Sequence, residues 1–270
     1  MKDGDISSNL TYQELCNAAE KGAEALNDLI KDYKGKLKKL DKAPFSGDTI
    51  MHFAARYAPD SLKLLIDKFG YNAPDIQNAD GNTAAHYAAR YNPDSLKLLI
   101  KTFPGKAFNK QNHFGNTALH WAAKHNKKSL EHFINNFEPS FVLSVANKFG
   151  ETLAHLAAKR NTESLKLLIE SFGEKALKAT NIYGETALHI AVQHNTDSLA
   201  VLLSRFAERV KELFKSELFK VVEHDNYEVT ISTGSLETYS QTFLADNVKT
   251  LLDSGDNYCS LAIQFAGLSH

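Results

Sequence analysis

The chain has 270 residues, of which 43% are hydrophobic, so its composition predicts a folded core rather than a disordered chain. Lysine and arginine number 31 against 32 acidic residues, a balance that gives no net field to attract nucleic acid or an anionic membrane. No run approaches the ~18 apolar residues of a bilayer span. The opening residues MKDGDISSNL lack the basic and apolar layout of a secretory signal. We therefore expect a folded protein with no membrane span and no nucleic-acid partner.

The first predicted element is a helix pair near the N-terminus. The stretch YQELCNAAEKGAEALNDLIKDY aligns with TIMHFAARYAPDSLKLLIDKF further along, so that Ala18 and Ala19 fall on Ala54 and Ala55. A terminal repeat must cover a stacking face on one side and meet water on the other, and it is therefore atypical. We interpret 1–46 as an N-terminal segment and capping repeat.

Five repeats follow, and each opens with a glycine. Successive glycines lie 34, 34, 35 and 34 residues apart, and a fixed period in this range is typical of a solenoid. The glycines are Gly47, Gly81, Gly115, Gly150 and Gly184. The repeats occupy 47–80, 81–114, 115–149, 150–183 and 184–206, the last with an uncertain end.

Each repeat divides into a turn and two helices. In the second repeat, Asn78 to Gly81 predicts a hairpin-like turn, and Thr83 is a good N-cap for a short helix with paired alanines. Asn92 is expected to end that helix in a left-handed conformation, and Ser95 to begin the second helix. The apolar residues of that second helix, at helical spacing, form its predicted buried face. In the first repeat they are Leu62, Leu65, Ile66 and Phe69.

The final segment, 207–270, predicts a C-terminal helical cap. The stretch DSLAVLLSRFAERVKELFKSELFKVVEH indicates an extended second helix, GSLETYSQTFLADNVKTLLDSG a helix pair, and CSLAIQFAGL a last short helix. Both a further degenerate repeat and an unrelated cap fit this pattern, and we favour the repeat. The predicted fold class is therefore all-α.

The repeats resemble the ankyrin repeat, whose pattern is roughly G-x-T-P-L-H-x-A-A-x-x-G with a leucine-rich second helix. The resemblance covers about Gly47 to Phe206. The family's proline after threonine is absent, and its glycine at the end of the first helix is replaced by asparagine in four repeats and by Ala58 in the first. The resemblance implies a solenoid of stacked helix pairs that binds proteins through its concave face.

A histidine recurs three residues after each threonine. Equivalent residues in stacked repeats lie about 10 Å apart, whereas zinc needs its ligands at ~2 Å from one centre. The histidines therefore cannot converge on a metal, and we expect each to bond the threonine and backbone of its own or the adjacent turn. The series is His52, His86, His120, His155 and His189. No cofactor is predicted.

A catalytic site is the weaker alternative. Cys259 begins an apolar helix in the predicted cap, where the helix dipole would lower its pKa. The last ~60 residues are too few for a thiol-hydrolase domain, and His224 and His270 are the only histidines close to it in sequence. The chain is therefore predicted not to be an enzyme. We interpret the remaining histidines as surface or loop residues; they are His113, His125, His132, His194 and His224.

The resemblance implies binding residues on the hairpin tips and first helices. Aromatic side chains recur there beside a basic column, which suits a partner with an acidic and apolar surface. The candidate partner-binding residues are Phe45, Arg56, Tyr57, Arg90, Tyr91, Phe114, Trp121, Lys124, Phe149, Lys159, Arg160 and Tyr183. Polar positions on the same elements extend the candidate surface: Asp48, Asp80, Asn82, His113, Asn116, His125, Glu151, Glu185, Gln193 and His194.

The chain also looks like an ankyrin-repeat effector of an intracellular bacterial pathogen. It is small and rich in lysine and asparagine, and Leu268 fits the hydrophobic residue near the end of the C-terminal signal used in type IV secretion. The resemblance implies a monomer secreted into the host cytoplasm that binds a host cytosolic protein. The alternatives are a eukaryotic ankyrin adaptor in the cytoplasm and an effector enzyme that uses Cys259.

Overall fold

The computed structural model describes residues 12–32, 42–43, 45–70, 75–103 and 108–205, together with three strands between 219 and 244. The chain divides into two compact units, one formed by 1–122 and 128–138 and the other by 123–127 and 139–270. No helix within the described ranges is long and apolar enough to cross a membrane.

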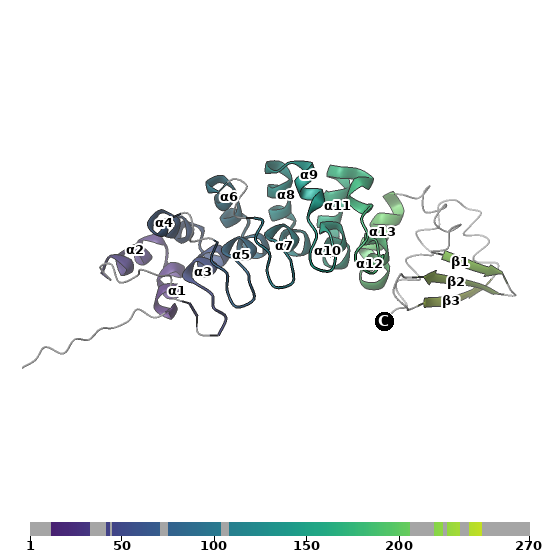
Figure 1. Cartoon of the computed structure of the whole chain (residues 1–270), viewed down its shortest axis with the longest axis horizontal. Helices are drawn as coiled ribbons and strands as arrows, with labels where there is room; N and C mark the ends of the chain where they lie inside the picture. The colour runs from purple at the N-terminus through teal and green to yellow at the C-terminus, as the bar shows by residue number, and fades with distance from the viewer. Residues whose placement is uncertain are drawn as a thin grey trace, which may run out of the picture. The chain divides into compact units, whose positions relative to one another are not determined.

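The first unit is built from antiparallel helix pairs. Its helices are α1 (Tyr12–Lys21), α2 (Ala23–Asp32), α3 (Ile50–Tyr57), α4 (Pro59–Phe69), α5 (Ala84–Tyr91) and α6 (Pro93–Thr102), followed by most of α7 (Ala118–His125) and α8 (Lys127–Asn136). The first helices stack in one row, α1 on α3 and α3 on α5, and the second helices in another, α2 on α4 and α4 on α6 (Figure 1). Each sequence repeat therefore forms one layer of the stack.

The second unit continues the same plan. It contains α9 (Pro139–Ser144), α10 (Leu153–Arg160), α11 (Thr162–Phe172), the 3-10 helix η2 (Gly173–Leu177), α12 (Ala187–His194) and α13 (Thr196–Arg205). The first helices α10 and α12 pack together, as do the second helices α11 and α13. The predicted helix pairs of the repeats are therefore present in both units.

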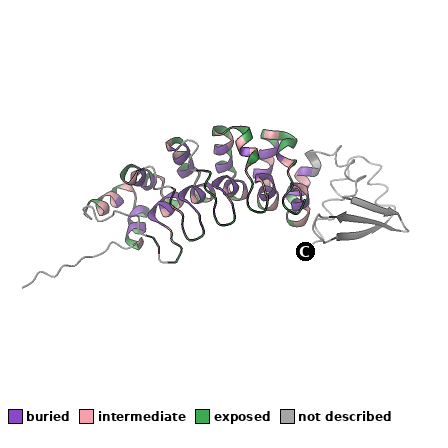
Figure 2. Cartoon of the chain, in the orientation of Figure 1, coloured by how far each residue is buried: buried purple, intermediate pink, exposed green. Residues whose placement is uncertain are grey.

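Small residues in the first helices let neighbouring repeats approach closely. The paired alanines, such as Ala88 and Ala89, have no exposed surface, and neither do Leu96 and Leu99 of the second helix. In Figure 2 the first helices α5 and α7 are mostly buried, whereas exposed residues gather on the outer sides of α8 and α11. Removing one such leucine costs about 2–5 kcal/mol of stability. Of the predicted buried face of α4, only Phe69 differs, since it is half-buried at the last position of the helix.

The residue between the two helices is not left-handed, contrary to our expectation. Asn92 has φ −140° and ψ 96°, and Asn161 and Ala58 have similar extended backbones. The second helix begins at once, at Pro93, so Asn92 serves as its N-cap and not as a left-handed helix end. Its Oδ1 accepts hydrogen bonds from the backbone of Asp94 and Ser95, both at 3.1 Å. The predicted start of the second helix at serine was therefore two residues too late.

The C-terminal segment contains a sheet where we expected helices. Strands β1 (Phe219–Glu223), β2 (Asn226–Ser232) and β3 (Thr238–Leu244) form an antiparallel sheet in the order β1-β2-β3. Val221 pairs with Val229, which in turn pairs with Gln241. The prediction of a helical cap is thus wrong for these strands, and the all-α class holds for the stacked helix pairs. The rest of 206–270 lies outside the described residues, including Cys259 and His224.

Candidate functional site

The predicted hairpin turns are present, and asparagine closes them. In the second repeat the N–H of Asn78 donates to the oxygen of Asn82 at 2.9 Å, and the N–H of Gly81 donates back to Asn78 at 3.0 Å. The Oδ1 of Asn78 accepts from the backbone of Asp80 and Asn82, at 3.0 and 2.8 Å. Gly81 has φ +80°, a conformation that favours glycine. The tip is therefore held by its own side chain.

Neighbouring tips are also joined to one another. In the first unit the N–H of His113 donates to the oxygen of Asp80 at 3.0 Å, and in the second unit Ile182 donates to Phe149 at the same distance. Each bond joins one hairpin to the next within its unit. The tips thus form a bonded row whose side chains project from a fixed backbone.

The repeat histidine bridges two hairpins in three of the repeats. The Thr83 N–H donates to Nδ1 of His86 at 3.1 Å, so the proton of the neutral imidazole lies on Nε2. Nε2 then donates to the backbone oxygen of Asn116 in the next repeat, at 2.9 Å. Burial lowers the pKa of His86 to about 4. The structural role predicted for this residue is thereby confirmed, and the ring is neutral at physiological pH.

The same bond recurs in other repeats. His52 bonds the backbone oxygen of Asn82, and His155 that of Glu185, each at 2.9 Å. Burial lowers the pKa of both histidines and also that of His189. Among the residues that the structure describes, no group of three His, Cys, Asp or Glu side chains is placed to hold a metal ion.

Some polar residues that we placed on the binding surface join the hairpins instead. Asp48 accepts from Asn78 Nδ2 at 2.7 Å and from the Tyr87 hydroxyl at 3.2 Å. Asn82, which is only 4% exposed, accepts from Asn112 Nδ2 at 2.9 Å. Each bond runs from one repeat to the next. These side chains stabilise the stack and have little surface for a partner.

The longer glutamates at the same position turn back onto their own hairpin. Asn181 Nδ2 donates to Glu185 at 2.8 Å, and Gln193 Nε2 donates to the other carboxylate oxygen at 3.0 Å. Asn147 donates to Glu151 in the same way, at 2.8 Å. Glu185 is 6% exposed, so it belongs to the scaffold and not to the surface that we predicted.

Aromatic and guanidinium groups alternate along the first helices of the first unit. The Arg56 guanidinium carbon lies 4.7 Å from the centre of the Tyr57 ring and 4.1 Å from that of Tyr91. Arg90 lies 4.7 Å from the Tyr91 ring and 5.3 Å from that of Trp121. We call these five residues the Arg–aromatic ladder. Each cation–π contact of this kind contributes about 0.5–2 kcal/mol. Together these contacts hold the five side chains of the ladder in fixed positions.

Six of the seven predicted aromatic residues are exposed, whereas Trp121 is half-buried. The exposed fractions run from 37% for Tyr91 to 97% for Phe45. The exposed set is Phe45, Tyr57, Tyr91, Phe114, Phe149 and Tyr183. The sequence analysis missed Ile182, which is 62% exposed beside Tyr183 on a hairpin tip. Ile182 directly follows the turn asparagine Asn181, and the two residues after each turn asparagine are exposed in the structure. Its exposure could therefore have been predicted from its position in the repeat.

The predicted basic residues fall into two groups, one in each unit. Arg56 and Arg90 are half-buried within the ladder, and Trp121 lies at its end. In the second unit, burial and the positive charges of Lys159 and Arg160 lower the pKa of His194. These three residues therefore share one electrostatic environment. Lys124 is half-buried on α7.

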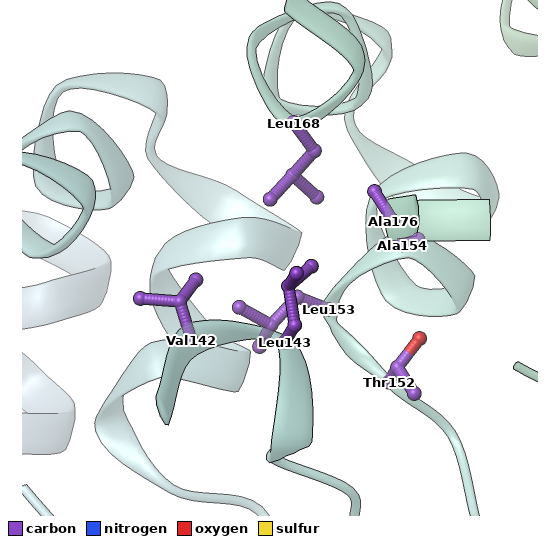
Figure 3. Close-up of a pocket in the computed structure, with 7 residues that line it drawn as sticks. All are labelled: Val142, Leu143, Thr152, Leu153, Ala154, Leu168 and Ala176. Carbon is purple, nitrogen blue, oxygen red and sulfur yellow. The ribbon is translucent and has the colours of Figure 1, made fainter. Parts of the chain in front are cut away.

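A small, partly open pocket lies among the described residues of the second unit. Val142, Leu143, Leu153 and Leu168 line it together with Thr152, Ala154 and Ala176 (Figure 3). It leaves about 10 Å³ for the centre of a water molecule, whereas a water needs at least that volume together with two or more polar partners. The pocket is a packing gap and not a ligand site.

In the first unit, Cys16 is buried, and burial raises the pKa of its thiol.

Stacked helix pairs joined by bonded hairpins define a helical repeat protein. The sequence model of ankyrin repeats in three copies matches residues 15–112 and 119–212. The chain belongs to the ankyrin-repeat family. No curated protein matches the sequence.

Three solved structures share the fold. A chain from the complex of the predatory endopeptidase Bd0816 of Bdellovibrio bacteriovorus with the immunity protein Bd3460 is 27% identical, with a TM-score of 0.56. The match covers 71% of this chain and 97% of that one. The ankyrin-repeat protein EF0377 is 22% identical, with a TM-score of 0.56 and coverage of 72% and 98%. The ankyrin domain of Bcl-3 is 23% identical, with a TM-score of 0.57 and coverage of 76% and 88%.

The family defines the general role of the chain. Ankyrin repeats are protein–protein interaction modules, and their fold is typically a binding scaffold without catalytic activity. The regular hydrogen bonds of the hairpins and histidines occupy the repeated positions. Binding specificity is therefore left to the residues that vary between repeats at the tips and on the first helices.

Proposed function

We propose that the chain captures a cytosolic protein of a eukaryotic host, as an effector secreted by a bacterium. The partner docks on the hairpin tips and first helices, and the chain acts by binding and not by catalysis. The observation that carries this proposal is the set of exposed aromatic side chains on a backbone that hydrogen bonds hold in place. Exposed aromatic residues on a rigid scaffold are typical anchors of protein interfaces.

The bacterial setting rests on the sequence. The chain is rich in lysine and asparagine, and all five repeats lack the family's proline after threonine. A chain from a bacterial complex is similar to it at 27% identity. A translocation reporter fused to the chain, in a bacterium with a type IV secretion system, tests the setting. Signal in the host cytosol supports it, and retention in the bacterium contradicts it.

Capture from eukaryotic cytosol, read by mass spectrometry, tests the binding face. The face variant changes Tyr57, Tyr91, Phe114 and Phe149 to Asp, which adds four negative charges at exposed aromatic positions. The control variant adds the same charge at exposed polar residues away from the tips. These residues are Asn135, Asn136, Ser140 and Ser171, all changed to Asp. Circular dichroism checks that both variants are folded.

We expect wild type and the control to retain the same protein and the face variant to lose it. Equal capture by all three places the interface elsewhere on the chain. Absence of any captured protein contradicts a host partner, and a Cys259→Ala variant then tests the enzyme alternative. A Cys259→Ala variant that keeps every cellular phenotype excludes it.

A second candidate is a partner inside the bacterium. It is favoured by the similarity to a chain from the complex of an endopeptidase with its immunity protein. The wild type and the same two variants, applied to a lysate of the source bacterium, separate the two candidates. Capture of a bacterial protein, with none from eukaryotic cytosol, supports the second.

A further inference from the structure

We propose that Arg56, whose guanidinium lies over the rings of Tyr57 and Tyr91, is the receptor for a carboxylate on an acidic segment of the partner protein. The inference rests on the proposed protein-binding function and specifies the chemistry of the partner. It concerns only the Arg–aromatic ladder of the first unit.

The Arg56 guanidinium has donors that the fold leaves unused. Its Nε is buried and makes no hydrogen bond. Among the described residues, no salt bridge involves Arg56 either. Buried polar groups in folded proteins are almost always hydrogen-bonded, so an unused donor of this kind indicates a missing acceptor.

The neighbouring rings determine where that acceptor can bind. The guanidinium carbon lies over both the Tyr57 and the Tyr91 ring, 4.7 and 4.1 Å from their centres. The N–H groups of a guanidinium lie in its plane, so an acceptor reaches them from the edge. A carboxylate matches this edge with two parallel hydrogen bonds. Asp48, an acidic residue of the same repeat, is already bonded to Asn78 and Tyr87.

The ladder fits a short segment with more than one carboxylate. Arg56 and Arg90 lie over the same Tyr91 ring, at 4.1 and 4.7 Å from its centre, so their guanidinium carbons are less than 9 Å apart. Alternate residues of an extended segment are separated by about 7 Å, and residues four apart on a helix by about 6 Å. Two acidic side chains of either segment therefore reach both arginines. The exposed surfaces of Tyr57 and Tyr91 provide apolar contacts beside them.

Trp121 provides a direct optical probe. It is the only tryptophan in the chain, and its ring lies 5.3 Å from the Arg90 guanidinium and 6.2 Å from the Tyr87 ring. Its fluorescence therefore reports on the surroundings of this one ring, at the end of the ladder. Labelled hexaglutamate is titrated into the full chain at low salt, and both peptide anisotropy and Trp121 emission are recorded. Hexaglutamine of the same length measures binding that needs no carboxylate.

The variants are Arg56→Gln and, as a control, Lys97→Gln, which removes one positive charge from an exposed residue of α6. We expect hexaglutamate to bind wild type and Lys97→Gln alike, and Arg56→Gln at least about 10-fold more weakly, because a charge-assisted bidentate pair is lost. Equal affinity in both variants, or no anisotropy change in wild type, overturns the proposal. Binding of a phosphoserine peptide without any binding of hexaglutamate also overturns it.

Capture with the same variants separates this inference from the proposed function. A partner that is retained by Arg56→Gln but lost by the aromatic face variant overturns the inference and leaves the function standing. A partner lost by Arg56→Gln and retained by Lys97→Gln supports both. Failure to capture any protein contradicts the function, whereas the hexaglutamate titration still decides whether the ladder binds carboxylates.

Discussion

The Nε2 atom of His86 lies 2.9 Å from the backbone oxygen of Asn116, thirty residues further along the chain. The bond runs from a first helix to the hairpin of the next repeat. The other ring nitrogen accepts from Thr83. One imidazole thus satisfies a helix N-terminus and a turn in different repeats at the same time.

Replacing this ring should destabilise the stack. The substitution His86→Ala leaves the buried Thr83 N–H without its partner and removes one of two hydrogen bonds to the half-buried Asn116 oxygen, which keeps its bond from the Asn112 N–H. An unsatisfied buried group costs about 1–3 kcal/mol, so we expect a loss of about 2–4 kcal/mol in the free energy of unfolding. Urea denaturation followed by circular dichroism measures it. His113→Ala, at an exposed tip, is the control and should change stability by less than about 0.5 kcal/mol. Equal effects of the two substitutions would contradict the bridging role.

Stability should fall as the pH drops below the ordinary histidine pKa of 6.5. The folded pKa of His86 is about 4, so between these values the unfolded chain binds more protons than the folded one. The stabilisation is therefore complete above pH 6.5 and is lost as the pH falls through the folded pKa. For His86 alone it amounts to about 3 kcal/mol.

The pH dependence can be assigned to this one ring. The difference in unfolding free energy between wild type and His86→Ala should be largest at pH 7.5 and shrink toward pH 4. Denaturation curves at four pH values between these limits give the difference directly. A difference that stays constant over the range would show that His86 does not titrate as its burial requires.

Gly81 should tolerate alanine much less well than Gly70 does. Both have positive φ, +80° and +76°, so both substitutions strain the backbone by about 1–2 kcal/mol. A Cβ at Gly81 would also lie 2.9 Å from the His113 ring and 3.0 Å from its backbone nitrogen, whereas a Cβ at Gly70 meets nothing within 4 Å. We expect Gly81→Ala to lower the melting temperature by several degrees more than Gly70→Ala does. Similar shifts would mean that the hairpins are not packed as closely as described.

Ala58 offers a site for stabilisation. It occupies the same extended position before Pro59 that Asn92 occupies before Pro93, but it provides no side-chain cap. Ala58→Asn should cap α4 as Asn92 caps α6 and raise the free energy of unfolding by about 1 kcal/mol. The reverse change, Asn92→Ala, should lower it by a similar amount. Asn92→Asp retains the acceptor and should stay within about 0.5 kcal/mol of wild type.

The repeats could be predicted from the sequence because their signals are local. The turn from Asn78 to Gly81 and the cap at Thr83 depend on residues two to four positions apart, and the structure confirms both. The partner of His86 is thirty residues away, so its identity depends on the stacking geometry. The position of Asn92 was predicted correctly but its conformation was wrong, because its side chain bonds the following helix and not the preceding one.

The C-terminal strands were missed because apolar spacing was interpreted as helical. The segments FKVVE, NYEVTIS and TYSQTFL are rich in β-branched and aromatic residues, which favour strands. The first two are separated by only two residues, as in a tight hairpin.

The candidate surface was also predicted only in part. Exposed aromatics followed from position in the repeat, whereas the stacking of Arg56 on Tyr91 required neighbouring repeats to be placed in space.

The bond from a histidine to the hairpin one period later, which His52, His86 and His155 make, has an evolutionary consequence. Duplication or loss of one whole repeat leaves every threonine, histidine and carbonyl in its place, because each donor meets the same acceptor in the next copy. A gene encoding such a chain can therefore change length by in-frame recombination between its own repeats without unsatisfied groups at the junction. Insertions that are not a whole repeat long must lie in segments that do not separate a histidine from its acceptor by a different spacing. The stretch after α8, which contains α9, is a segment that carries such additional structure. New binding surface is then gained one repeat at a time.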